Sequence, residues 1–426
     1  MKNQLIIYQG KLLSRLIKTA NLGDGSTWPG HIALKQNPNF IKHILKNSKT
    51  KVIFIVGTNG KTTTSALLTH LLKADHKKVI LNTSGANLIN GIASALLLNT
   101  DIKGQLKIDY ALFEIDENAF PQACKEVTPN AIVMLNLFRD QLDRYGEVNT
   151  IASKWSKTIS QLPGSTKLYL NADDPLIASL GKDANQKVFY FGLDEKTSTR
   201  PDLISDSAYC PKCGSKLLYD KTYYSHLGIW SCPKGDLARP ASVTTSAPSY
   251  ILNGMYNKYN TIAAYITALH EGISHTTLST ALTTFKPAFG RQEKIEINGK
   301  KIEVILAKNP AGFNQTLHTV VALKAKNILI LLNDKIADGT DVSWIWDVDF
   351  EILTNKKIAI TLSGDRVYDL ALRFKYAEID FDIQISVADS IKAALKNLEP
   401  NDTLYIIPTY TAMLDVRKVL TGKKIL

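Results

Sequence analysis

Short apolar runs alternate with amphipathic stretches over the first two hundred residues of the chain. The runs are rich in Val, Ile, Leu, Phe and Tyr, and their length is typical of strands that are buried on both faces. Segments between them, such as 62–74 and 150–162, repeat apolar residues at helical spacing. This alternation predicts an α/β fold with a parallel sheet and helices on both faces. The expected strands are 51–57, 77–83, 109–116, 131–137, 167–173 and 187–192.

The alternation breaks near residue 200. Residues 201–245 contain three cysteines, prolines and short polar stretches, so we predict an insertion there instead of another crossover unit. A helical pattern returns at 257–272, and a second strand–helix series follows, with apolar runs at 327–333, 356–362 and 403–409. We place a domain boundary near Gly290. The prediction is a lead-in at 1–45, a central domain at 46–290 that contains the insertion, and a Rossmann-like α/β domain at 291–426.

Charge and hydropathy narrow the class of partner. The 426-residue chain carries a net charge of +12, which favours anionic ligands such as nucleotides, nucleic acid or an acidic membrane face. No stretch approaches 18 apolar residues and no cleavable leader follows Met1, so we expect a cytoplasmic protein that is not an integral membrane protein. Residues 4–20 place apolar residues on one face with Lys and Arg opposite. Such a segment either packs on its own domain or lies on a membrane surface.

A glycine turn between the first strand and the first helical pattern predicts phosphate binding. Gly57 and Gly60 let backbone N–H groups point at phosphate oxygens, and the helix that follows offers its positive N-terminus. Lys61 supplies a point charge, and the Thr62 hydroxyl suits Mg²⁺. The end of the third strand offers carboxylates for the same ion, and Glu114 is the favoured ligand over its neighbours Asp116 and Glu117.

The cysteines of the insertion suggest a ribbon. Cys210 and Cys213 have the two-residue spacing of a zinc knuckle, and Cys232 opens a second, incomplete one in which Gly235 stands at the last ligand position. His226 lies between the two halves and is a candidate fourth ligand. Bound Zn²⁺ and a ribbon without metal both remain open. Cys124 is expected to be a packed helical residue.

Six motifs occur in order along the chain: "GTNGKTTT", "FEIDEN", "NLFRDQLDRYGE", "NADDP", "NKYNTIAA" and "GRQE". Together they resemble the Mur ligases and the related folylpolyglutamate synthetases. Three further features are residues 82–92, the cysteine insertion, and the acidic and apolar motifs of the C-terminal half, and these are similar to the MurT synthetase subunits of lipid II isoglutaminyl synthase. The resemblance runs from about residue 28 to near the end.

The resemblance implies roles for individual residues. ATP would be held by the loop from Gly57 to Thr63, with Mg²⁺ on Thr62 and on the catalytic Glu114. Asn257 and Asn260 would lie near the adenine, although Asn260 could equally cap its helix. Arg291 would reach a nucleotide phosphate. The implied phosphate-loop residues are Gly57, Thr58, Asn59, Gly60, Lys61, Thr62 and Thr63.

The resemblance also implies an activity in peptidoglycan biosynthesis. The chain would use ATP to convert the α-carboxylate of D-glutamate in the lipid II stem peptide to an acyl phosphate, and ammonia would then give D-isoglutamine. A separate glutaminase subunit, GatD in that family, would supply the ammonia in a heterodimer at the inner face of the membrane, with no nucleic acid involved. Two alternatives stay open: an amino-acid ligase that acts on a carboxylate substrate without a partner, and a nucleotide-dependent binding protein.

One motif of the family is altered in this sequence, and one acidic segment allows two interpretations. Ordinary Mur ligases carry an Asp-His pair whose His binds a second Mg²⁺, but the corresponding residues are Asp140 and Gln141, which puts that second ion in doubt. The acidic segment 338–349 either caps a local helix or reaches into the glutaminase. In the MurT–GatD family the synthetase is thought to contribute a carboxylate that orients the partner's Cys-His pair. For that catalytic role we favour Asp341, with Asp347 next.

Overall fold

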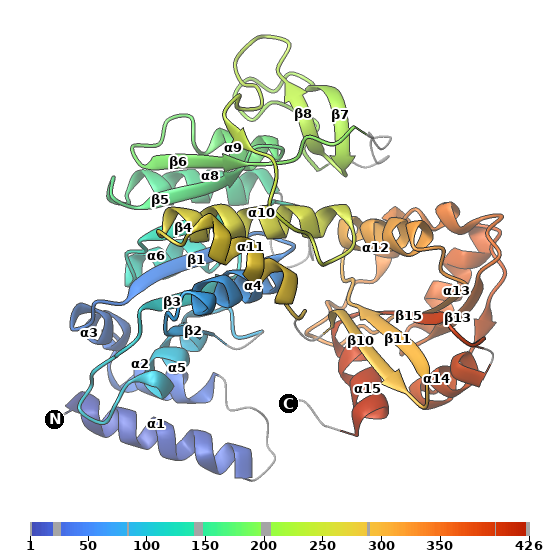
Figure 1. Cartoon of the computed structure of the whole chain (residues 1–426), viewed down its shortest axis with the longest axis horizontal. Coiled ribbons are helices and arrows are strands. Elements are labelled where there is room, and N and C mark those ends of the chain that lie inside the picture. The colour runs from blue at the N-terminus through green and yellow to red at the C-terminus, as the bar shows by residue number, and fades with distance from the viewer. Residues whose placement is uncertain are drawn as a thin grey trace.

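The computed structural model of the chain contains two large sheets and a small two-stranded insertion that projects from the first of them (Figure 1). It describes residues 2–19, 27–82, 85–139, 148–196, 206–287, 290–396 and 398–422. Within these ranges no helix combines the length and the apolar character that crossing a membrane requires. The Asp140–Gln141 pair lies outside the described residues, so the doubt about a second Mg²⁺ remains a prediction.

The first sheet is parallel throughout, and every strand expected before residue 200 is confirmed. Parallel strands need crossover connections, and the helices between them supply these. In sheet order the strands are β2 (Val79–Leu81), β3 (Tyr110–Ile115), β1 (Lys51–Val56), β4 (Ala131–Met134), β5 (Lys167–Asn171), β6 (Lys187–Phe191) and β9 (Val243–Thr244).

Both faces of this sheet are covered, because side chains alternate along each strand. In β1, Val52 and Phe54 join one apolar cluster, whereas Ile53 and Ile55 join the other. The first cluster lies under α1 (Lys2–Thr19), α2 (Trp28–Gln36), α3 (Phe40–Lys46), α5 (Ile89–Asn99), α6 (Phe120–Glu126), α8 (Val148–Ser160) and α9 (Pro175–Ser179). The second lies under α4 (Lys61–Ala74), α10 (Met255–His270) and α11 (His275–Thr284).

The second sheet begins at Arg291 and is mixed. Its first two strands form an antiparallel hairpin through Asn298 and Gly299, whose positive φ angles of 50° and 76° suit a tight two-residue turn. The remaining pairs are parallel. In sheet order the strands are β10 (Arg291–Ile297), β11 (Lys300–Ile305), β15 (Thr403–Pro408), β12 (Asn327–Leu331), β13 (Ala359–Ser363) and β14 (Asp382–Ile383), and the helices are α12 (Pro310–Ala322), α13 (Val367–Tyr376), α14 (Val387–Lys396) and α15 (Tyr410–Thr421).

The insertion is built on one antiparallel hairpin, β7 (Leu218–Tyr224) and β8 (Leu227–Ser231), which projects from the edge of the central sheet (Figure 1). Buried polar contacts attach it there. The Trp230 indole donates to the Ala172 carbonyl at 3.0 Å, and the Arg239 guanidinium donates to the Asp173 carboxylate at 2.6 Å. The hairpin is therefore attached to the end of β5 by directed hydrogen bonds.

The opposite end of the sheet is closed by Glu271, the residue that ends α10. Its carboxylate accepts hydrogen bonds from Lys51 at 2.7 Å, Lys167 at 2.9 Å and the Tyr110 hydroxyl at 3.1 Å. Burial alone would raise the pKa of Glu271, but the hydrogen bonds and charges of the two lysines outweigh it and lower that pKa below its ordinary value. The ionised carboxylate thus ties one helix to three strands.

We predict that Glu271→Gln lowers the free energy of unfolding by roughly 1–3 kcal/mol at neutral pH, because hydrogen bonds to a buried charge are lost. A depressed pKa in the folded state gives stability that is present above the unfolded pKa and is lost as pH falls through the folded one. The difference in the free energy of unfolding between wild type and variant, measured by urea unfolding, should therefore become smaller in acid. Glu399→Gln, at an exposed position, is the matched control. A difference that becomes larger in acid would contradict the assignment.

Candidate functional site

The turn between β1 and α4 has the conformation that phosphate binding requires. Gly57 and Gly60 have φ angles of 139° and 93°, which L side chains rarely adopt, and α4 begins directly at Lys61. Gly60 is also pressed against Asn260, since a Cβ atom on Gly60 would lie 2.1 Å from the Asn260 Oδ1 atom. Both glycines are therefore needed for backbone shape.

Side chains from the neighbouring strand hold this loop. The Asn59 N–H donates to Asn136 Oδ1 at 2.8 Å, and the Asn136 amide donates back to the Asn59 carbonyl at 3.1 Å. Thr58 makes a similar two-way contact: its hydroxyl accepts from the Phe138 N–H at 3.0 Å and donates to the Phe138 carbonyl at 3.1 Å. The loop is thus prearranged by the segment that follows β4.

The same loop contacts the C-terminal domain through a reciprocal amide pair. Asn309 caps the N-terminus of α12 by accepting from the Gly312 N–H at 2.8 Å. Its amide nitrogen donates to Asn59 Oδ1 at 3.0 Å, and the Asn59 amide donates to Asn309 Oδ1 at 3.3 Å. This pair joins the phosphate loop to the first helix after the β10–β11 hairpin.

Charged and hydroxyl groups gather where the loop meets the end of β3. Lys61 Nζ lies 3.1 Å from a Glu117 carboxylate oxygen and also donates to backbone carbonyls of the loop. Glu114 accepts from the Thr62 hydroxyl at 2.9 Å and from the Ser65 hydroxyl at 2.6 Å, and it is 6% exposed. Carboxylate and hydroxyl oxygens are the ligands that Mg²⁺ prefers, so these residues fit that ion.

A cavity of about 460 Å³ opens beside these groups, between the two sheets. Arg291 faces it from the start of β10. Burial lowers the pKa of the Arg291 guanidinium, while the Glu114 carboxylate and nearby tyrosines act in the opposite direction. The lining residues that bear on chemistry are Lys61, Thr62, Glu114, Glu117, Arg291 and Lys308, and the cavity extends to Ala337 and Tyr410.

A narrower pocket adjoins the loop on the side of α10. Asn260 accepts from the Thr64 hydroxyl at 3.3 Å and donates to Asn257 Oδ1 at 3.2 Å, and Asn257 donates to the Asn253 carbonyl at 2.7 Å. Both asparagines line this pocket with Arg291, Tyr256 and, from the insertion, Tyr224. Asn260 is fully inside α10, so the structure does not give it the helix-capping role that the sequence left open.

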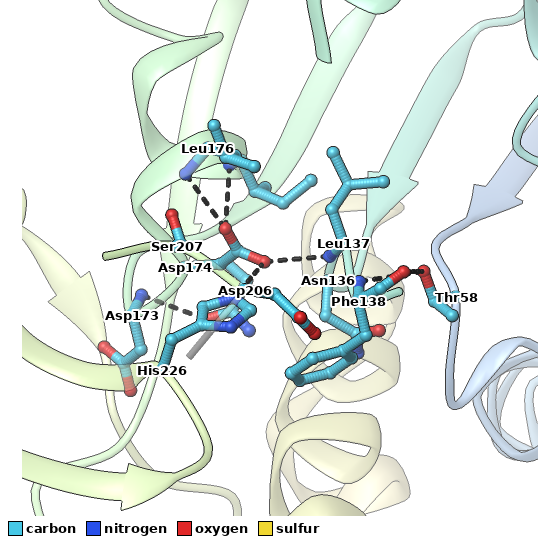
Figure 2. A network of polar contacts seen from close by, with 12 residues as sticks. Thr58, Asn136, Leu137, Phe138, Asp173, Asp174, Leu176, Asp206, Ser207 and His226 are labelled. Carbon is cyan, nitrogen blue, oxygen red and sulfur yellow. Dashed lines mark hydrogen bonds and ion pairs between the residues drawn. The ribbon is translucent and has the colours of Figure 1, made fainter. Parts of the chain in front are cut away.

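Figure 2 shows how the insertion contacts the segment behind the phosphate loop. The buried Asp174 carboxylate accepts from the Leu137 N–H at 2.8 Å and caps α9 through Leu176 and Ile177. His226, from the turn of the β7–β8 hairpin, lies with its Nε2 atom 3.3 Å from Asp174 Oδ2, and its ring packs on Phe138. The Phe138 backbone in turn bonds the Thr58 hydroxyl, so ring packing followed by hydrogen bonds connects the insertion to the loop.

Three of the four expected zinc ligands come together. The Sγ atoms of Cys210, Cys213 and Cys232 all lie within 4.8 Å of one another. His226 does not belong to this group, because it is fully buried against Asp174, and we withdraw it as a ligand. Asp236, which the sequence reading did not consider, lies beside the three thiols with a carboxylate oxygen 3.9 Å from Cys232 Sγ, but it is not one of the three mutually close ligand atoms. Gly235, with φ of 73°, turns the chain back toward the thiols.

The acidic segment after β12 divides into buried and exposed parts. Asp338 is 4% exposed and accepts from the Thr411 backbone N–H at 2.8 Å and from its hydroxyl. Asp341 is exposed and accepts from the Ser343 N–H at 2.8 Å, and this bond lowers the pKa of Asp341. Asp347 lies at the end of the 3₁₀ helix η1 (Ser343–Asp347), 3.9 Å from the Arg139 guanidinium. Asp341 and Asp347 therefore stay candidates for a role outside the chain, and Asp349 of the same segment is exposed as well.

Comparison with known proteins identifies the family. Residues 55–268 match the Mur ligase middle domain, and residues 306–413 match the MurT ligase C-terminal domain. The chain is 36% identical over 407 residues to the lipid II isoglutaminyl synthase (glutamine-hydrolyzing) subunit MurT of Staphylococcus aureus (strain COL), covering 91% of each chain. The chain belongs to the MurT family. A MurT subunit of Streptococcus pneumoniae is 32% identical over 428 residues, 95% of this chain and 94% of that protein.

Solved structures agree on the Mur ligase fold. A pseudomurein peptide ligase type C from Methanothermus fervidus gives a TM-score of 0.68 at 24% identity over 90% of this chain and 81% of that one. MurF from Acinetobacter baumannii gives 0.63 at 18% identity over 91% and 80%. These likenesses and the two sheets confirm the expected fold class for this MurT family member.

Proposed function

We propose that this chain is the synthetase subunit of a lipid II isoglutaminyl synthase, which amidates the α-carboxylate of D-glutamate in the stem peptide to D-isoglutamine. Membership of the MurT family supports the reaction class, an ATP-dependent ligation in peptidoglycan synthesis. The observation that carries the assignment to these residues is the cavity in which the loop lysine, Glu114 and Arg291 converge.

The reaction would proceed in two displacements. A carboxylate oxygen of the substrate attacks the γ-phosphorus of ATP and ADP leaves; ammonia then attacks the acyl phosphate carbon, and phosphate and a proton leave. Lys61 would exchange Glu117 for phosphate oxygens, and the backbone N–H groups of the loop would bind the same anion. Thr62 and Glu114 would hold Mg²⁺, which neutralises phosphate charge when bound. Arg291 would stabilise the negative charge that develops beside the substrate carboxylate.

Exposed aromatic residues support the proposal that a glutaminase partner docks beside the acidic segment. Trp346 is 47% exposed and stacks edge-on against Tyr376 with ring centroids 5.3 Å apart. Tyr368, Leu372 and Tyr376 are all exposed and recur at every fourth position of α13. Exposed aromatic residues beside polar loops are typical of protein interfaces. Trp344, by contrast, is partly buried against Phe313, so it offers less surface to a partner than Trp346 does.

Zinc would be held by the three thiolates and Asp236. Three sulfur ligands leave a tetrahedral ion open, and a carboxylate oxygen is an acceptable fourth ligand. Asp236 follows Cys232 by four residues and lies near it already, although Lys212 competes for the same carboxylate at 3.8 Å. The three cysteines lie at the end of the insertion that is away from the phosphate loop. An ion there would stabilise the fold of the insertion, so we assign it a structural role.

We predict that Lys61→Ala or Thr62→Ala lowers ATP-dependent amidation of lipid II by about 100-fold or more, because each removes a group that meets phosphate or metal. Lys61→Ala leaves the buried Glu117 carboxylate without its ion pair, so its thermal midpoint should fall, whereas that of Thr62→Ala should change by only a few degrees. Lys73→Ala, an exposed lysine on the same helix, is the matched control. Turnover at the wild-type level in either variant would refute the phosphate-loop assignment. Ligation of an amino acid instead of ammonia would favour the alternative ligase.

We predict that Asp341→Asn, in complex with the glutaminase, cuts glutamine-dependent amidation by roughly 10³–10⁴-fold, as expected when a carboxylate that orients a catalytic imidazole is lost. Amidation driven by added ammonium should stay near wild type, because only glutamine hydrolysis needs that carboxylate. Asp347→Asn tests the second candidate, and Asp349→Asn is the control in the same segment. Equal loss of both activities in Asp341→Asn would exclude the proposed role.

We predict near one equivalent of zinc in the purified chain. Asp236→Ala should weaken zinc binding by more than the roughly 10–100-fold that losing an outer-shell partner costs. Cys210→Ser should lower the thermal midpoint while it leaves turnover of the folded protein near wild type. Asp220→Asn, an exposed residue of the same insertion, is the control. Cobalt substitution adds a spectroscopic readout of the ligand set. Metal-free protein of full stability would rule the site out, and an unchanged cobalt spectrum in Asp236→Ala would exclude the fourth ligand.

A further inference from the structure

The first helix, α1, has two apolar faces. Ile6 and Ile7 are buried, and Gly10 packs so closely on α5 that an added Cβ atom would lie 2.6 Å from a Leu97 methyl carbon. Side-chain bonds also fix the helix in place, including one of 2.8 Å from Asn37 to Asn3. This half of α1 confirms the interpretation of a helix packed on its own domain.

The other half of α1 exposes a second apolar stripe. Four residues in this stripe are between 46% and 60% exposed, which is high for large apolar side chains on an ordered helix. At 3.6 residues per turn they occupy an arc of roughly 80° on the side opposite the buried residues. A helix that is apolar on both sides needs a second partner. The stripe consists of Leu5, Tyr8, Leu12 and Leu16.

Charge identifies the kind of partner. The helix contains no Asp or Glu, and Lys11 and Arg15 flank the stripe on one side. The first fifty residues contain eight Lys and Arg and one Asp. A second copy of the chain would bring two such basic surfaces together, which is unfavourable, whereas an anionic lipid surface matches both the charge and the apolar stripe.

We propose that the outer face of α1 is a membrane-docking surface that binds anionic phospholipid, with the four stripe residues entering the acyl boundary and the flanking cations at the headgroups. Helix α1 lies at the outer margin of the central domain, far from the insertion (Figure 1). Its neighbour α5 begins beside Leu88 at the mouth of the large cavity and is about 16 Å long. If the proposed function holds, a docked α1 would keep that cavity within reach of a lipid-linked substrate.

The test is cosedimentation of the full-length protein with vesicles, without ATP or substrate. Vesicles of phosphatidylglycerol and phosphatidylcholine in equal parts should bind the protein, and phosphatidylcholine alone should bind it at least about tenfold more weakly, because the anionic attraction is missing. The combined variant Leu5→Gln, Leu12→Gln and Leu16→Gln should lose about 100-fold in affinity for the mixed vesicles. Lys11→Gln with Arg15→Gln should lose most of the preference for the anionic lipid.

Leu218→Gln is the matched control, because Leu218 is 56% exposed on the insertion, at the opposite end of the molecule. Unchanged near-ultraviolet circular dichroism and thermal midpoint would show that the variants fold. Failure of the wild type to bind the mixed vesicles, or equal binding by the leucine variant, would overturn the proposal. A stripe-dependent dimer in the absence of lipid would also overturn it. Because the assay contains no substrate, a failed amidation proposal would leave this result unaffected.

Discussion

The reciprocal amide contact between Asn59 and Asn309 is the interaction on which the arrangement of the site depends. It joins the phosphate loop to the first helix of the C-terminal domain, and each asparagine is also bonded on its own side, Asn59 through its backbone N–H and Asn309 through its side-chain oxygen. Two neutral hydrogen bonds contribute only about 1 kcal/mol each in net terms, so they do not lock the domains by themselves. Their effect is positional: they hold α12 against the phosphate loop, beside the hydrogen bonds that Gln292 of β10 makes with Asn253 and Tyr256.

A second contact, which a bound phosphate could replace, joins Lys61 at the end of the loop to Glu117 after β3. Lys61 ion-pairs with Glu117 in a largely enclosed place, where an unpaired ammonium would be costly. When a phosphate binds Lys61, it therefore replaces one anionic partner of the lysine by another. At no point is the ammonium buried without a partner, so that energetic cost is avoided. Glu117 is then left as a carboxylate beside Glu114 and the metal position, which favours cation binding at the same moment. Nucleotide and metal binding are expected to be mutually supporting for this reason.

Local patterns in the sequence predicted much of this fold and part of the site. The continuous apolar run of β1 and the glycines around Lys61 are local features, so their consequences could be inferred from neighbouring residues. Asn309 and Tyr224 were missed because their contacts with Asn59 cross 250 and 165 positions of sequence. The asparagine before Pro310 did carry a local signal, that of a helix cap, but not of its second bond. His226 was misjudged because ligand spacing does not reveal which way a hairpin turns.

The proposed partner surface, the proposed lipid surface and the cavity lie on different parts of the molecule. The aromatic patch of α13 and the acidic segment belong to the C-terminal domain, the stripe of α1 belongs to the far side of the central domain, and the cavity lies between the domains (Figure 1). A partner on α13 and a lipid surface under α1 would therefore not compete. Ala337, at the start of the acidic segment, lines the cavity that Leu88 borders on the α5 side. A small nucleophile arriving from the partner and a carboxylate arriving from the membrane side would enter the same cavity from different ends, and each could be admitted without displacing the other.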